Sequence, residues 1–349
     1  AENGIRYEYS DLYYRESNGE VTITDCSQFA TTVSIPNQIN GYPVTGIGDS
    51  AFSGCSKLSS ITIPDSVTSI GSYVFSGCAI SWISIPNSVT EIADFAFAYS
   101  SLWSITIPDS VASIGNYALN RCASLRIITI PDSVASIGDY AFYNCSSLSS
   151  ITIPGSVTSI GCDAFLGCTY LANINVSEDN KYYCSINGVL YNKDKTLLVR
   201  YAPGKTESSF SVYYSVKSIE DGAFSGCSNL SSITIPNGVT SIGDSAFYGC
   251  SNLSSITIPG GVTSIEDSAF YGCSNLSSIT IPNGVTSIGD SAFYDCSKLS
   301  SITIPEGVTN IGDCAFIYCR NLSSITIPGG VRIIGDSAFR GCSNLSSIT

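Results

Sequence analysis

A phenylalanine recurs along this chain every 22 or 23 residues, and this period constrains the fold more than any other feature. Leucine replaces it once, and one interval of 59 residues, between Phe165 and Phe224, interrupts the series. Such a period is typical of a solenoid, because the core of a globular domain scatters its apolar anchors along the sequence. The anchor position holds Phe52, Phe75, Phe97, Leu119, Phe142, Phe165, Phe224, Phe247, Phe270, Phe293, Phe316 and Phe339.

One copy of the repeat, residues 253–275, reads LSSITIPGGVTSIEDSAFYGCSN. Its alternation of polar and β-branched residues predicts a strand with Ile256 and Ile258 facing inward, and the proline that follows ends the strand. Asp267 is a favourable N-cap for a short helical or 3-10 turn over residues 268–272, and irregular connections complete the coil. One coil cannot bury its own apolar side chains. We therefore expect the coils to stack around a shared apolar axis, with parallel strands roughly 4.8 Å apart.

The pattern L-x-x-I-x-I-P-x-x-V-x-x-I-G-x-x-A-F-x-x-C resembles the 23-residue repeat of the BspA-like leucine-rich repeat family of surface proteins. The resemblance covers residues 44–171 and 218–349. Residues 19–24 and 35–44 resemble the opening coil of that family, and residues 182–198 resemble the insertion found between its repeats. The resemblance implies a leucine-rich repeat solenoid. It also implies a non-catalytic binding or adhesion protein that is secreted or displayed on the cell surface.

The repeat divides the chain into four segments. We predict an N-terminal cap over residues 1–43, a first repeat block over 44–171, an insertion over 172–217 and a second repeat block over 218–349. Within the insertion, two strand-like runs flank residues 192–195 and predict a β-hairpin. The second block ends within a strand and without a polar cap, so we expect either a longer natural chain or a partner subunit that covers this edge.

The composition excludes several classes of function. With 28 acidic and 15 basic residues the net charge is −13, which gives no basic field for nucleic acid or an anionic membrane. No apolar run is long enough for membrane insertion. Histidine is absent, which removes the usual general base and the imidazole metal ligands, and no nucleophile or phosphate-binding motif occurs. We therefore expect no enzyme, no catalytic residue, no metal and no cofactor.

The chain has 15 cysteines, and most of them occupy one column of the repeat, three residues after the anchor. Cysteines stacked in a column have parallel Cβ vectors, which do not suit a disulfide, so we predict a reduced packing ladder. Any disulfide would involve one of Cys26, Cys162, Cys184 and Cys314, which lie off the column. The column consists of Cys55, Cys78, Cys122, Cys145, Cys168, Cys227, Cys250, Cys273, Cys296, Cys319 and Cys342.

Aspartates form a second column, three residues before the anchor. Stacked carboxylates could collect calcium, but the calcium-binding β-roll signature is missing. We therefore interpret the aspartates as caps of the short helical turns. The column holds Asp49, Asp94, Asp139, Asp221, Asp244, Asp267, Asp290, Asp313 and Asp336.

Three successive coils depart from the Ser/Thr face that the strands present to solvent. Trp82 and Trp103, the only tryptophans, replace serines in two neighbouring coils, and Arg126 and Ile127 replace both serines in the third. Exposed Trp and Arg beside an apolar residue are typical interface anchors, so we predict a ligand-binding patch here. The alternative is drift in a degenerate repeat.

A second candidate surface lies in the insertion. Its basic residues could attract an acidic partner to an otherwise acidic protein. The alternative is a solvated insertion that fills a gap in the stack. The residues concerned are Lys193, Lys195, Arg200 and Lys205.

Three functions are compatible with the sequence. The first is an extracellular scaffold that recognises, through its sheet face, a protein or a glycan on another cell or in the extracellular matrix. The second is a structural protein that assembles head to tail into filaments by self-association of the uncapped C-terminal coil. The third is ice binding by the Ser/Thr array, although Trp82, Ile127, Asn173 and Asn175 interrupt that array.

Overall fold

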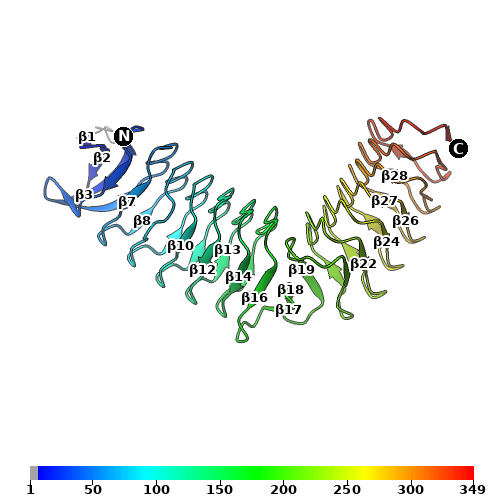
Figure 1. Cartoon of the computed structure of the whole chain (residues 1–349), viewed down its shortest axis with the longest axis horizontal. Helices are drawn as coiled ribbons and strands as arrows, with labels where there is room; N and C mark the ends of the chain where they lie inside the picture. Colours follow the sequence, from blue (N-terminus) through cyan, green and yellow to red (C-terminus); the bar gives the residue numbers. More distant parts are fainter. Residues whose placement is uncertain (1–6) are drawn as a thin grey trace. The chain divides into compact units, whose positions relative to one another are not determined.

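The computed structural model describes residues 7–349, so the first six residues of the predicted cap lie outside the described part. Residues 7–349 form a β-solenoid of short strands joined by turns, and they contain no helix. The chain divides into two compact units. Of the described residues, the first unit comprises 7–171 and 175–182, and the second comprises 172–174 and 183–349. Within each unit, successive coils lie side by side (Figure 1).

The N-terminal strands cover the start of the first stack of coils. Strands β1 (Tyr7–Tyr9), β2 (Leu12–Ser17) and β3 (Glu20–Cys26) form an antiparallel meander. Strand β3 then pairs in parallel with β6 (Tyr42–Ile47), which β5 (Gln38–Ile39) joins in a hairpin. The edge of the first repeat is therefore paired and is not open to solvent.

Most coils carry two short strands, where the sequence predicts one. The first strand comes from the Ser-Ile-Thr segment and the second from the Ser-Ile pair before the aspartate, and each pairs in parallel with the next coil; for example, Ile256 pairs with Ile279. The first set is β4 (Thr32–Ser34), β7 (Ser60–Thr62), β10 (Ser104–Thr106), β12 (Ile127–Thr129), β14 (Ser150–Ile153), β16 (Asn173–Val176), β20 (Ser209–Ser211), β22 (Ser232–Thr234), β24 (Ser255–Thr257), β26 (Ser278–Thr280), β29 (Ser324–Ile325) and β31 (Ser347–Ile348). The second set is β8 (Ser69–Ile70), β9 (Glu91–Ile92), β11 (Ser113–Ile114), β13 (Ser136–Ile137), β15 (Ser159–Ile160), β21 (Ser218–Ile219), β23 (Ser241–Ile242), β25 (Ser264–Ile265), β27 (Ser287–Ile288), β28 (Asn310–Ile311) and β30 (Ile333–Ile334).

The apolar columns form the core, as the sequence predicts. Ile256 and Ile258 are only 5% and 3% exposed. The rings from Phe224 to Phe339 stack with centroids 5.2 to 5.4 Å apart. All fifteen cysteines are free thiols, and column thiols donate to the preceding coil: Cys273 Sγ lies 3.2 Å from the carbonyl oxygen of Phe247. The cysteine column is therefore a reduced ladder that both packs and hydrogen-bonds.

The predicted helical turns and their aspartate caps are wrong. The residue after the aspartate has a positive φ, 53° at Ser268, which a right-handed helix does not accommodate. The segment forms successive turns instead. Asp267 Oδ1 accepts the backbone N–H of Asp290 in the next coil, at 2.7 Å. The neighbouring glycine is needed for this close stacking, because a Cβ at Gly289 would collide with Asp267.

Alkylation of the native protein at pH 8 should separate the two kinds of cysteine. The thiolate is the reactive form, and burial raises the pKa of the Cys273 thiol far above its ordinary value, whereas Cys162 is exposed. We expect iodoacetamide to modify Cys162 and to leave Cys273 unmodified while the protein is folded, as measured by peptide mass spectrometry. Protein unfolded in guanidinium, in which both react, is the control. Equal rates for the two cysteines in the native protein would contradict the ladder.

Replacing Asp244 should test the carboxylate ladder. Burial, and after it the Asp221 carboxylate, raises the pKa of Asp244. Folding therefore penalises the ionised form of this side chain. The penalty is absent at pH 3 and grows as the pH rises through the raised pKa. An amide makes the same bond, because Asn116 Oδ1 accepts the N–H of Asp139 at 2.8 Å. We expect Asp244→Asn to raise the midpoint of guanidinium denaturation at pH 7 but not at pH 3.

The matched variant Asp244→Ala leaves the N–H of Asp267 without its acceptor, which lies at 3.2 Å in the native protein. The loss should reduce the free energy of unfolding by about 0.5–1.5 kcal/mol and so lower the denaturation midpoint at both pH values. A lower midpoint for Asp244→Asn than for the native protein at pH 7 would show that the negative charge itself stabilises the ladder.

Candidate functional site

The first repeat block presents its two tryptophans to solvent. Trp82 is 65% and Trp103 is 49% exposed. Trp82 immediately precedes Ile83, which faces the core at 2% exposure, so the indole of Trp82 points outward. Trp103 lies at a bend between the buried Leu102 and β10, in a column where most other coils carry an exposed serine. The bulky indoles therefore lie on the face where most other coils carry serine.

The strand register brings the four predicted residues together. The backbone N–H of Trp103 donates to the carbonyl of Ser81 at 2.7 Å, and that of Arg126 donates to the carbonyl of Trp103 at 2.9 Å. Trp103 and Arg126 therefore occupy one column on adjacent coils. Ile127 pairs with Ser104, and these two residues belong to the neighbouring column of outward side chains. Trp82 lies in that neighbouring column too, on the coil before Ser104. We name Trp82, Trp103, Arg126 and Ile127 the Trp–Arg patch.

A hollow of ≈ 390 Å³ adjoins the Trp–Arg patch. Arg126, Ser147, Ser149 and Tyr170 line it. Tyr170, which is 70% exposed, was not predicted as a site residue. Its signal is present in the sequence, because the same position of the repeat is serine or asparagine in neighbouring copies. The position precedes the strand, so the strand pattern does not indicate it.

The insertion contains two antiparallel pairings, where the sequence predicts a single hairpin. Strands β17 (Tyr183–Ile186) and β18 (Val189–Asn192) form a hairpin, and β18 pairs with β19 (Leu197–Arg200) across the predicted turn. Strand β19 then pairs in parallel with β21, so the insertion continues the second set of strands.

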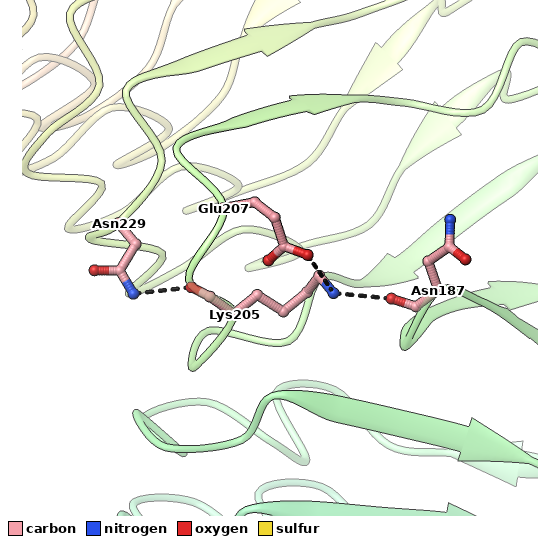
Figure 2. Close-up of polar contacts among 4 residues, drawn as sticks. All are labelled: Asn187, Lys205, Glu207 and Asn229. Atoms are coloured by element: carbon pink, nitrogen blue, oxygen red, sulfur yellow. Dashed lines mark hydrogen bonds and ion pairs between the residues drawn. The ribbon is translucent and has the colours of Figure 1, made fainter.

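Of the four basic residues predicted as a docking surface, two make contacts within the second unit. Arg200 is 4% exposed and donates to the carbonyls of Gly222 and Ser225, the latter at 3.1 Å. Lys205 donates to the carbonyl of Asn187 at 2.9 Å and pairs with Glu207 at 3.2 Å (Figure 2). The Arg200 contacts join the insertion to the second repeat block, and the Lys205 contacts join segments within the insertion.

The other two basic residues lie nearer to solvent. Lys195 lies over the ring of Tyr213, with its ammonium 5.4 Å from the ring centroid. Lys193 is exposed. Glu207 is also exposed, and its own backbone N–H, followed by the Lys205 ammonium, lowers the pKa of its carboxyl.

No three His, Cys, Asp or Glu side chains of residues 7–349 are placed to hold a metal ion together. In the same range, no helix has the length and hydropathy to span a membrane.

Comparisons with known proteins agree with this architecture. The family model described as "BspA type Leucine rich repeat region (6 copies)" matches residues 22–102, 90–187, 205–320 and 263–349. A search of the curated proteins finds no match to the chain.

Three solved structures resemble the chain over nearly its whole length. A leucine-rich cell surface protein from Faecalibacterium prausnitzii is 31% identical, with 99% of this chain and 95% of that chain covered and a TM-score of 0.76. The pneumococcal vaccine antigen PcpA is 26% identical, with 99% and 98% covered and a TM-score of 0.81. A leucine-rich repeat protein from Eubacterium ventriosum is 30% identical, with 97% and 94% covered and a TM-score of 0.68. These matches confirm the resemblance seen in the repeat: the chain belongs to the BspA-type leucine-rich repeat family.

Proposed function

We propose that this chain is a cell-surface scaffold that binds its partner, a protein or a glycan on another cell or in the extracellular matrix, through the Trp–Arg patch. The supporting observation is the exposure of two tryptophans on adjacent coils, beside an arginine and an exposed isoleucine. Trp and Arg are the residues most often found as energetic anchors of interfaces. The family contributes the non-enzymatic repeat scaffold and the surface location.

The fold itself does not require these residues. In the second block, serines occupy the column of Trp103, and they bond to the preceding coil: Ser254 Oγ donates to the carbonyl of Ser231 at 3.1 Å. Within residues 7–349, the side chains of Trp103 and Arg126 make no such bond. Large apolar side chains at solvent-facing positions gain little from folding, so binding accounts for them better than stability does.

The insertion is a weaker candidate for the docking surface. The side chains of Arg200 and Lys205 are committed to contacts within the second unit. A partner that displaced Arg200 would leave the buried carbonyl of Ser225 without a donor, which is unfavourable, and one that displaced Lys205 would have to break its ion pair with Glu207. We therefore assign these two residues to the stability of the insertion.

The substitution Arg200→Met should destabilise the protein without affecting the Trp–Arg patch. It keeps an unbranched apolar stem but removes the guanidinium, which leaves the carbonyl of Ser225 without its donor at a cost of about 1–3 kcal/mol, while the carbonyl of Gly222 keeps the N–H of Ser225. We expect a lower melting temperature in calorimetry. The matched control Lys217→Met removes the same charge from an exposed position of the insertion and should leave the melting temperature within error. Equal melting temperatures for the two variants would contradict this assignment.

The double substitution Trp82→Ser, Trp103→Ser should abolish binding. Serine is the residue that other coils carry at these positions, so the fold is retained. Native protein is screened against a panel of glycans and matrix proteins, and each hit is retested with the double variant. We expect affinity to fall at least tenfold, since a single anchor tryptophan is typically worth about 2 kcal/mol or more.

The matched control for that experiment is Tyr214→Ser, which removes an aromatic side chain that is 78% exposed in the second unit. It should bind like the native protein. Circular dichroism and melting temperature verify the fold of each variant. Native affinity in a folded double variant would remove the Trp–Arg patch as the binding surface.

A further inference from the structure

The hollow beside the Trp–Arg patch exists because three successive coils differ in side-chain size. Arg126 belongs to the first coil, Ser147 and Ser149 to the second, and Tyr170 to the third. The short serines leave space between the two long side chains. If serine or asparagine replaced Arg126 and Tyr170, as in other coils, all the side chains here would be short and would enclose no hollow. The hollow therefore results from these two substitutions and not from the repeat itself.

The polar groups that line the hollow are available to a ligand. Within residues 7–349, the side chains of Arg126, Ser147, Ser149 and Tyr170 form no ion pair or hydrogen bond with other groups of the chain. Ser149 differs in this from Ser254, which occupies the same column in the second block and donates to the preceding coil. The hollow therefore offers one guanidinium and three hydroxyl groups.

These groups match a sugar that carries a carboxylate. A guanidinium binds a carboxylate through two parallel hydrogen bonds, and hydroxyls both donate to and accept from sugar hydroxyls. Trp103 lies on the coil before Arg126, on the side away from Tyr170, so it borders the site and does not line it. The volume of ≈ 390 Å³ lies within the ≈ 300–1,000 Å³ typical of small-ligand sites.

We propose that the hollow binds a pyranose bearing a carboxylate, either a uronic acid or a sialic acid at the end of a glycan. Arg126 holds the carboxylate, and Ser147, Ser149 and Tyr170 hold the ring hydroxyls. The proposal rests on the proposed function, because it specifies which partner the Trp–Arg patch recognises.

The test uses tryptophan fluorescence of the full chain. Trp82 and Trp103 are the only tryptophans, so their emission reports on this face alone. The protein is titrated with methyl glucuronide and with sialyllactose, which distinguish the two sources of carboxylate, and with lactose and an oligoglutamate peptide. The variants are Arg126→Ser and Tyr170→Asn, which restore the residue types of other coils, and the control Arg332→Ser, which removes an exposed arginine from the second unit.

Saturable binding of one or both acidic sugars, at least tenfold tighter than binding of lactose, is the expected result. Arg126→Ser should lose at least tenfold of that affinity and Tyr170→Asn severalfold, while Arg332→Ser matches the native protein. Three results overturn the proposal: lactose binds as tightly as the acidic sugars, oligoglutamate binds as tightly as they do, or Arg126→Ser retains native affinity. Absence of binding by any sugar also overturns it.

The same variants separate the two proposals. If Arg126→Ser binds every partner from the panel with native affinity while Trp82→Ser, Trp103→Ser does not, the inference about acidic sugars fails and the proposed function stands. If the double tryptophan variant retains native affinity for those partners, the proposed function itself fails.

Discussion

Coil-to-coil stacking is the interaction on which the structure depends. Among the described residues, a coil does not form all the hydrogen bonds of its own backbone. On the strand side, the N–H of Thr286 donates to the carbonyl of Thr263 in the preceding coil, whereas on the turn side the N–H of Phe270 donates to the carbonyl of Ala292 in the following coil. The apolar columns follow the same rule, since each phenylalanine ring buries its faces against the rings of its neighbours. Stability is therefore a property of adjacent pairs of coils and not of any single coil.

This dependence separates residues that maintain the fold from residues that are free to vary. Inward columns cannot change without affecting two neighbours, whereas the outward strand positions contribute at most a hydroxyl–carbonyl bond such as that of Ser254. Such a bond is worth about 1 kcal/mol. Replacing it with Trp103 costs the fold little and places a large interaction surface in solvent. A solenoid can thus acquire a binding site by substitution in a few coils, with no new loop or domain.

The sequence predicted the parts of the fold that follow from periodicity. The stacked coils, the inward isoleucines, the phenylalanine column and the reduced cysteine column are confirmed because each depends only on spacing. The aspartate contacts were missed, because they depend on the positive φ at Ser268, which a serine does not signal. Arg200 looked like a surface cation because sequence gives no measure of burial. The hollow was missed because it depends on the difference in size between Ser147 and Tyr170. These residues occupy the same repeat position on adjacent coils, and that position lies outside the strand pattern.

The acidic character of the protein also limits how an anionic ligand can be recognised. With a net charge of −13, the long-range field repels a carboxylate, so electrostatic attraction does not bring the ligand to the surface. At physiological ionic strength, however, exposed charges more than about 8 Å away are largely screened. Recognition must then come from contacts at short range, and Arg126, the one charged residue lining the hollow, supplies the local charge. An isolated arginine among hydroxyls discriminates by hydrogen-bond geometry, which favours a carboxylate held beside the hydroxyls of a sugar ring over a carboxylate that carries no such partners.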